Sequence, residues 1–472
     1  MQTHIHLSQK FPFKTITLLL LMMNVCAVAP LNAATTDEIQ AAPTVETRSK
    51  PLSLIDVYHQ ALAKDATLLS SLKANQASQE LIEQGKALYR PTVSFTANAN
   101  ATQTDIKYIG ANIFRNEGRS NFEGYNYGVN ARQPIFRKQN WVQMDQSKTQ
   151  VSQADKQLHL AQQQLILRVT QAYFDVLIAQ DRIALLQAQK EATQSQLEQA
   201  KANFEVGTAT ITDFNEAKAR YDLIVAQEVA AQNAYEVAQY SIQLMTDAAP
   251  SKLATARADL QTEPLQSMQN WLDVAMQNNL TIQIQQDALK LAVQEVERNQ
   301  AGHLPTIDAV ASYTKSYSNG NVNGFGSDLK SAVVGLQLEL PLYQGGAISS
   351  QVRQAVLNKQ RAEEDIELAR RNATLETQRA YLNLNTSMAQ IAAFEQALSS
   401  AQSQLDSTKL GFEVGVRTNV DVLNAQQLLF SAKRDLLEAR YQYLANTIRL
   451  KAASGLVAEV DLADINQQLV TQ

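Results

Sequence analysis

Two long stretches of the chain repeat apolar residues at alternating steps of three and four. The first series begins at Val151 and reaches Ile183, and the second begins at Ala362 and reaches Ile391. This period places the apolar side chains on one face of a helix. Many of the repeated residues are alanine, which lets neighbouring helices approach closely, as in coiled coils. Both stretches are therefore predicted to be long helices packed side by side.

Proline and glycine, which disrupt helix interiors, are almost absent from the same stretches. Between Pro134 and Pro250 there is no proline and a single glycine, and after Pro341 there is no proline at all. A helix from Gln139 to Phe204 is predicted, with a length on the order of 100 Å at about 1.5 Å per residue. A rod of this length exceeds what an ordinary globular domain needs.

Four other segments alternate apolar and polar residues with the period of a β-strand. Each has about ten residues, which is enough to cross a bilayer when the strand is tilted. Polar loops are predicted between the strands of each pair, at 104–123 and 316–328. The strands are predicted at 93–100, 125–132, 307–314 and 332–340.

Alternation alone leaves two interpretations of these strands open: a soluble sheet packed on the helices, or strands that enter a membrane. Tyrosines near the strand ends favour the membrane, because outer-membrane strands carry aromatic girdles at both interfaces. After the first 33 residues, no run of about 18 apolar residues could form a spanning helix. The tyrosines are Tyr108, Tyr125, Tyr127, Tyr313 and Tyr317.

The two halves of the chain are copies of each other. Residues 204–213 read FEVGTATITD and residues 412–421 read FEVGVRTNVD, with six identities in ten at an offset of 208. Each half is predicted to run helix, strand, loop, strand, long helix, turn, shorter helix. Because four strands cannot close a barrel and an open edge in lipid leaves backbone groups unpaired, several copies of the chain must share one barrel. Three copies would give twelve strands, enough to begin holding a lumen.

Reversal of the chain is predicted at one glycine in each copy, Gly207 and Gly415. Just beyond each glycine lies the pattern Thr-x-x-Asp, at Thr210–Asp213 and at Thr418–Asp421. The pattern resembles a capping box that starts the returning helix. A carboxylate in the first turn stabilises the helix dipole by about 0.3–1 kcal/mol whatever its function.

The N-terminal residues have the order of a secretory signal peptide, predicted at 1–33. Lys10 and Lys14 precede an apolar run at 16–28. That run is too short to serve as a membrane anchor, which needs about 20 residues. Cys26, the only cysteine, lies in the predicted leader, so the mature chain is expected to have no thiol and no disulfide. No lipid on Cys26 is expected either, because Val25 is larger than the small residue that usually precedes a lipidated cysteine.

Charge and composition exclude several classes of protein. The chain has 41 basic and 46 acidic residues, and the loss of two basic residues with the leader leaves a net charge of −7. This balance argues against nucleic-acid binding, which favours a basic face. The five histidines are scattered, and no P-loop, nucleophile elbow or dinucleotide-binding glycine pattern occurs. No enzyme activity, cofactor or metal is expected.

Residues 51–455 resemble the TolC family of outer-membrane efflux and type I secretion channels. The most specific piece is FEVGVRTNVDVLNAQQ at 412–427, followed by its copy at 204–217. The stretch LPLYQGG at 340–346 also fits. So do the strand-bounding prolines Pro91, Pro134, Pro305 and Pro341.

The resemblance implies an α+β membrane protein of the TolC-like fold. In that fold, long antiparallel α-helices form a trimeric helical barrel across the periplasm, under a 12-strand β-barrel with four strands per protomer. The homotrimer would lie in the lipid of the outer membrane. It would act as a passive exit duct for efflux or type I secretion. Its implied partners are a periplasmic adaptor and an inner-membrane ABC or RND-type transporter.

The resemblance also implies a gate at the periplasmic end of the helical barrel. By position, the arginine of its polar network is Arg417, the acidic partner is Asp213, and the constriction aspartate is Asp421. Phe412 stands where the type member has a tyrosine, and Asn424 stands where it has a second aspartate ring. A looser closure and a weaker attraction for cations are therefore expected.

Arg417 is the residue of this gate in which the two copies differ most. It aligns with Ala209 at the offset of 208, so the shared turn does not require an arginine. Its predicted role is a latch that holds the gate shut.

An alternative class is a periplasmic coiled-coil adaptor or tether, which would have one helical hairpin flanked by short soluble β-domains. The predicted division of the chain favours the channel, because two hairpins each follow a pair of strands. The divisions are a signal peptide at 1–33, a linker at 34–50, a first repeat at 51–249, an inter-repeat linker at 250–267, a second repeat at 268–455 and a tail at 456–472.

Overall fold

The computed structural model describes residues 51–107, 109, 118–249, 253–256, 264–321 and 325–470, with the side chain of Val470 left out. The predicted signal peptide at 1–33, the linker at 34–50, Tyr108 and most of the linker at 250–267 lie outside the described residues. The described elements belong to the unit Ser49–Gln472.

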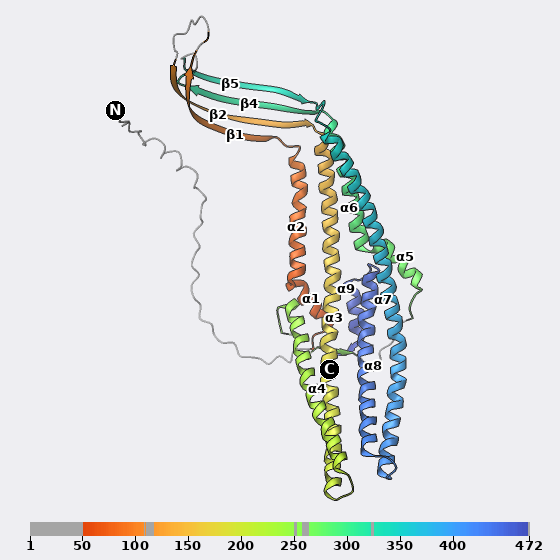
Figure 1. Cartoon of the computed structure of the whole chain (residues 1–472). Coiled ribbons are helices and arrows are strands. Elements are labelled where there is room, and N and C mark those ends of the chain that lie inside the picture. The colour runs from red at the N-terminus through yellow and green to blue at the C-terminus, as the bar shows by residue number, and fades with distance from the viewer. Residues whose placement is uncertain are drawn as a thin grey trace, which may run out of the picture. The chain divides into compact units, whose positions relative to one another are not determined.

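The described chain runs twice through the same order of elements (Figure 1). The predicted duplication is therefore confirmed, with the first helix of each half broken into two. The first half contains α1 (Leu54–Lys64), α2 (Ala66–Ala87), β1 (Thr92–Ile106), β2 (Gly118–Phe136), α3 (Lys138–Glu205) and α4 (Ile211–Thr246). The second contains α5 (Met268–Asn278), α6 (Leu280–Gln300), the 3₁₀ turn η1 (Ala301–His303), β4 (Thr306–Ser318), β5 (Ser327–Glu339), α7 (Ala347–Glu413) and α8 (Asn419–Ala453).

Short elements tie the C-terminal segment to the segment between the repeats and to the first half. The strand β6 (Leu469–Val470) pairs antiparallel with β3 (Thr255–Ala256). The helix α9 (Glu459–Gln467) packs against α1, where His59 and Glu459 are 2.7 Å apart. This segment therefore joins the end of the second repeat to the start of the first.

The four long strands form one antiparallel sheet in the order β1-β2-β4-β5. The hairpins of the two halves meet between β2 and β4, where Val129 is opposite Tyr313. The edge strands β1 and β5 each have one neighbour within the described chain. Both edges therefore present a row of backbone groups to whatever lies beside the sheet.

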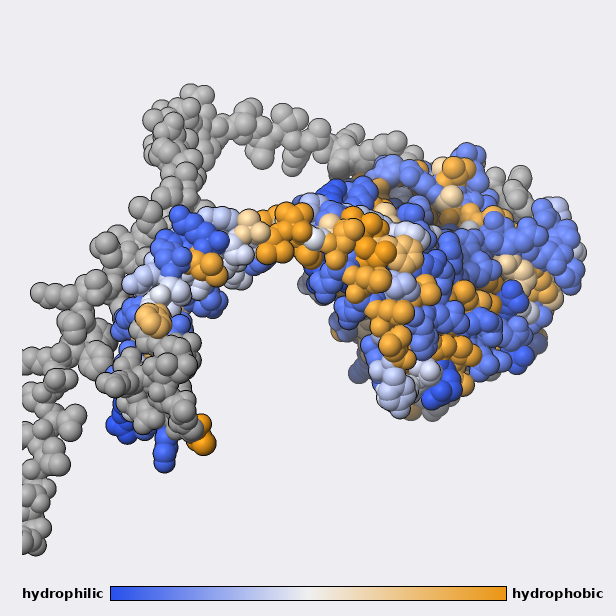
Figure 2. All heavy atoms as spheres, turned by 90° about the horizontal axis from the view of Figure 1, so that it is seen from above, coloured by the Kyte–Doolittle hydropathy of each residue, from blue (hydrophilic) through white to orange (hydrophobic). Residues whose placement is uncertain are grey.

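No helix covers either face of the sheet within the described residues. Apolar side chains of the edge strand β5 are exposed, including Val334, Leu336 and Leu338. Figure 2 shows hydrophobic residues gathered on the sheet toward its junction with the helices. The interpretation of the strands as a sheet packed on the helices is therefore wrong.

The strands are longer than the pattern of the sequence predicted. β1 has 15 residues and β2 has 19, and their pairing continues to Ile106 opposite Gly118. The prediction of loops throughout 104–123 and 316–328 was wrong at the ends of both segments. Apolar alternation reports only the part of a strand that meets an apolar environment, whereas the backbone ladder continues wherever polar side chains can face water.

Pro134 does not end its strand, contrary to the prediction. β2 continues to Phe136, and the register shifts between Pro134 and Phe136. Proline lacks the N–H that a regular ladder requires, so an irregular pairing of this kind accommodates it. The bulge lies directly before the start of α3, where the chain changes from strand to helix.

The long helices confirm the prediction made from the periodic pattern of apolar residues. α3 has 68 residues and begins and ends within one residue of the predicted bounds. Its apolar stripe is buried, with Leu165, Val169 and Val176 each at most 1% exposed. α3 packs against α4 in its own half and against α2, α6 and α8. The core therefore follows the helices, and it is centred where α3, α8 and α1 meet.

No helix within the described parts of the chain is both long enough and apolar enough to cross a membrane.

Candidate functional site

The turns that end α3 and α7 have the same backbone. Gly207 and Gly415 have φ angles of 80° and 85°, in the left-handed region that favours glycine. The amide nitrogens of Gly207 and Gly415 donate to the carbonyls of Phe204 and Phe412, each at 3.0 Å. These contacts satisfy carbonyls that a helix end leaves free.

The returning helices begin with capping boxes. In the first, the Thr210 amide and hydroxyl donate to Asp213 Oδ2 at 3.0 and 2.8 Å, and the Asp213 amide donates to Thr210 Oγ1 at 3.2 Å. Thr418 and Asp421 make the same three bonds at 2.9, 2.9 and 3.2 Å. The bonds from the backbone and hydroxyl of Thr418, together with the nearby charge of Arg417, lower the pKa of Asp421. Its carboxylate is therefore ionised at neutral pH.

Arg417 does not meet Asp213 within one chain. Among the ion pairs and hydrogen bonds of the described residues, none joins these two side chains. The side-chain stem of Arg417 instead lies over Gly411, where an added Cβ would be 2.7 Å from Arg417 Cγ. The charge of Arg417 acts on Asp421 of the same turn. The pairing of Arg417 with Asp213 of a neighbouring copy stays a prediction.

Phe412 is partly buried against the apolar contact between α7 and α8. That contact contains Leu405, Val422 and Leu429. The phenyl ring is therefore used in packing the hairpin, which needs no hydroxyl.

A polar contact between the two hairpins, which the sequence pattern did not reveal, involves Arg220 of α4. Its Nη1 donates to Gln427 Oε1 at 2.5 Å, and its Nη2 donates to Asn424 Oδ1 at 2.6 Å, both on α8. A signal was present, because the copy of Arg220 at the offset of 208 is Leu428. An arginine that replaces an apolar residue of the other copy indicates a contact that only one copy makes.

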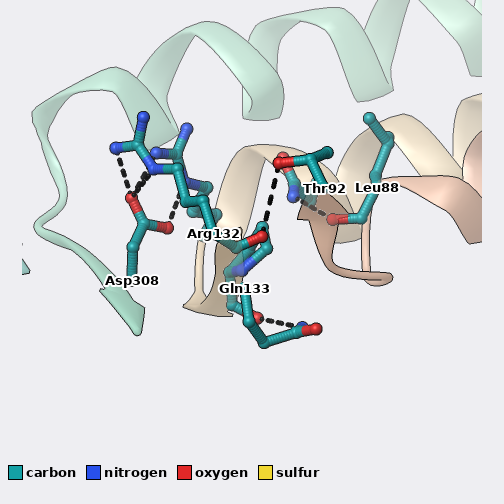
Figure 3. Close-up of polar contacts among 8 residues, drawn as sticks. Leu88, Thr92, Arg132, Gln133 and Asp308 are labelled. Carbon is teal, nitrogen blue, oxygen red and sulfur yellow. Dashed lines mark hydrogen bonds and ion pairs between the residues drawn. The ribbon is translucent and has the colours of Figure 1, made fainter. Parts of the chain in front are cut away.

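A second missed cluster joins the sheet to the helices. Asp308 of β4 has a side chain that is 2% exposed, and it accepts four hydrogen bonds. Two come from Arg132 of β2, at 2.8 and 2.5 Å, and two from Arg137, which precedes α3, at 2.9 and 2.5 Å. Figure 3 shows Asp308 and Arg132 facing each other across the sheet.

Neighbouring bonds fix α2 and β1 to the same joint. Gln133 Nε2 donates to the carbonyls of Tyr89 and Pro134 at 2.7 and 2.9 Å, and Asn140 Nδ2 donates to the carbonyl of Leu88 at 2.7 Å. The Thr92 hydroxyl donates to the carbonyl of Arg132 at 3.3 Å (Figure 3). The joint therefore sets the direction in which the strands leave the helices.

No set of three or more His, Cys, Asp or Glu side chains that could hold a metal ion occurs among the residues that the structure describes.

The geometry described above is that of a channel protomer, and comparison with known families agrees. The outer membrane efflux protein family matches residues 57–247 and 271–456. The chain belongs to this family.

Individual relatives and structures give the same result. The outer membrane protein TolC of Vibrio cholerae is 32% identical over 421 residues, covering 88% of this chain and 94% of that protein. The proteases secretion protein PrtF of Dickeya chrysanthemi is 29% identical over 424 residues, covering 88% and 91%. The CmeC outer membrane channel of Campylobacter jejuni has the same fold, with a TM-score of 0.74 at 16% identity, covering 93% of this chain and 97% of that one. Two of these are outer-membrane proteins by name and the third is a secretion protein, so the adaptor interpretation is not supported.

Proposed function

We propose that the chain is one protomer of a homotrimeric exit duct, which lets substrates leave the cell passively through the outer membrane. The observation that carries the proposal is the four-stranded sheet with two open edges and two uncovered faces. In lipid, each unpaired backbone group of an open strand edge costs about 2 kcal/mol or more. Pairing β1 of one copy with β5 of the next removes that cost, and three copies close a barrel of twelve strands.

The two helical hairpins of each copy supply the rest of the duct. Each hairpin has a helix of about 100 Å, at 68 and 67 residues. Three copies would place six such hairpins side by side under the barrel, as a tunnel through the periplasm. The free ends of these hairpins are the place where a periplasmic adaptor and an inner-membrane ABC or RND-type transporter would dock. The duct itself performs no chemical step, so the transporter supplies the energy.

The gate of this duct lies at the hairpin turns in our proposal. Arg417 of one copy would pair with Asp213 of a neighbouring copy, and three Asp421 side chains would form a ring of carboxylates. A ring of carboxylates favours cations in a pore. The proposed repeats span 51–249 and 268–455, with the linker at 250–267 between them.

Native mass measurement in detergent tests the assembly, and membrane fractionation tests the location. A trimer that sediments with the outer membrane and conducts ions in planar bilayers is expected. A monomer that stays soluble without detergent would contradict the proposal. For the gate, Asp421→Ala should lower the selectivity for cations, and unchanged selectivity would remove Asp421 from the constriction.

A further inference from the structure

Arg220 ties the two hairpins of one chain together close to their free ends. Its two hydrogen bonds, to Gln427 and Asn424, run from α4 to α8. One turn before Arg220 on α4, Ala217 packs with Ala200 of α3 and Leu423 of α8. The guanidinium is therefore held at a fixed position against the surface of α8.

The positive charge of Arg220 is weakly compensated. Both acceptors are uncharged amides, and Nε is buried without a hydrogen-bond partner. Within the described chain, the one carboxylate at ion-pair distance is that of Glu216 on the same helix, at 3.8 Å and 37% exposed. With side chains 27% and 37% exposed and a separation near the limit for an ion pair, this contact is partly screened by water and offsets only part of the charge. Because arginine stays protonated, Arg220 brings a full positive charge to Asn424.

That charge lies one helical turn from Asp421. Asn424 follows Asp421 by three residues on α8, so their side chains are neighbours, with about 5–6 Å between their Cβ atoms. Asp421 is kept ionised by the bonds of its capping box. The Asp421 carboxylate and the Arg220 guanidinium therefore lie about one helical turn apart along the same surface of α8.

Neither partner in this contact is required by the repeat. At the offset of 208, Arg220 corresponds to Leu428 and Asn424 corresponds to Glu216. Both copies form the same turn and the same type of helix without the other copy's residue. The arginine and its amide acceptor thus serve the contact between the hairpins.

We infer that Arg220 determines ion selectivity, by placing a positive charge beside Asn424 that offsets the preference of the Asp421 ring for cations. The inference rests on the proposed function, because it takes this surface of α8 to line the narrow end of the duct. In the trimer, three arginines would lie next to three aspartates. A ring of charge selects counter-ions in a pore, so the two rings act in opposite directions.

Reversal potentials measured across planar bilayers under a salt gradient test the inference. Arg220→Gln keeps a hydrogen-bond donor but removes the charge, and the ratio of cation to anion permeability should rise by about twofold or more, as for a charge acting at short range through water. Arg220→Lys keeps the charge and should leave the ratio at the wild-type value. Arg220→Leu, which installs the residue of the other copy, should behave as Arg220→Gln does.

Lys218→Gln is the matched control, because it removes a positive charge two residues away on an exposed part of α4. Its permeability ratio should equal that of the wild type. Equal ratios in the wild type, Arg220→Gln and Arg220→Leu, on trimers verified by native mass, would overturn the inference. So would a rise in Lys218→Gln as large as in Arg220→Gln. A wild-type trimer that conducts no ions would instead refute the proposed duct.

Discussion

The two returning helices, α4 and α8, start in the same way and end up in different surroundings. The φ angles of their turn glycines differ by only a few degrees, and their capping boxes have bonds of nearly equal length. Yet α8 has 16 buried residues and α4 has six. The reason is that α8 packs on α7 and also on α3 and α4, whereas α4 packs mainly on α3. The shared sequence sets the turn, and the second layer of contacts sets the environment.

The same difference recurs at the joint between the sheet and the helices. The first half supplies Arg132 and Arg137, and the second supplies Asp308. In the strands, the copies align on their bounding prolines, Pro91 with Pro305 and Pro134 with Pro341. In this alignment the copy of Arg132 is Glu339 and the copy of Asp308 is Ser94, and the pairing of Thr92 with Arg132 matches that of Thr306 with Glu339. The two halves have therefore diverged toward opposite charges where they touch. Duplication provided the backbone, and the divergence of side chains provided the contacts between the copies.

The largest expected effect comes from breaking the joint with Asp308→Ala. Removal of this carboxylate leaves two arginines without their acceptor, at a cost of about 3 kcal/mol, the low end for a buried pair because Arg132 is 46% exposed. Denaturant unfolding of the purified trimer measures the loss. Ser94→Ala, the corresponding change in the first half, is the control and should cost little. Equal losses would show that the cluster does not stabilise the joint.

The next largest loss of stability is expected at the helix junctions, which differ between the two halves. Asp65, between α1 and α2, caps α2 through the Leu68 amide at 2.8 Å and binds both terminal nitrogens of Arg168 at 2.9 and 2.8 Å. Asn279, between α5 and α6, is an uncharged cap. Asp65→Ala should cost about 2 kcal/mol and Asn279→Ala about 1 kcal/mol. Unfolding midpoints of the two variants decide the order, and a greater loss in Asn279→Ala would contradict this comparison.

Only the first of these junctions should respond to pH. The bonds from Arg168 lower the pKa of Asp65 in the folded chain, so its contribution to stability is full above the unfolded pKa of about 3.9 and is lost as the pH falls through the folded value. The stability advantage of wild type over Asp65→Asn should be constant above about pH 5 and shrink below about pH 4. Thermal unfolding across this range measures it. An advantage that does not change with pH would exclude the ionised form as its source.

Loss of the two capping boxes should destabilise the starts of α4 and α8 to different extents, although the hydrogen bonds of the two boxes have nearly equal lengths. Thr210→Ala and Thr418→Ala each remove a cap worth about 1 kcal/mol. Val422 and Leu423 are buried at the start of α8, whereas no residue of 211–214, the first turn of α4, is buried. Amide hydrogen exchange should therefore rise more at 211–214 in Thr210→Ala than at 419–422 in Thr418→Ala. Equal increases would mean that packing does not protect the start of α8.

Of these contacts, the pair made by Arg417 should contribute the smallest free energy, although its substitution can change the conductance strongly. An exposed arginine–carboxylate pair contributes about 0.2–1 kcal/mol, so three pairs would be weak enough for a docking partner to open. Arg417→Ser should raise the resting conductance of assembled trimers, and Arg417→Asp should raise it further because like charges then meet. Ala209→Ser, at the corresponding position of the first half, is the control. The same conductance in all four proteins would show that helix packing alone keeps the duct shut.

Much of the fold could be predicted because the signals are local. The stripe from Val151 to Ile183 and the absence of proline predicted α3 to within one residue at each end. The strand ends were wrong, because hydrophobic alternation does not report where the backbone ladder stops. The prediction that Pro134 ends its strand was also wrong, because a bulge lets β2 continue through the proline.

The sequence by itself determined the helices and the capped starts of the returning helices, because these depend on residues a few positions apart. It also revealed the duplication, because the two copies can be matched directly at an offset of 208. Tertiary structure decided which side chains meet. Arg220 contacts Asn424 from 204 positions away, and Asp308 contacts Arg132 from 176 positions away. Such contacts depend on the register of packed helices and paired strands, which no local pattern specifies. The repeat revealed only that these residues differ between the copies. The packing of one copy on the other shows why, because it brings the differing residues into contact.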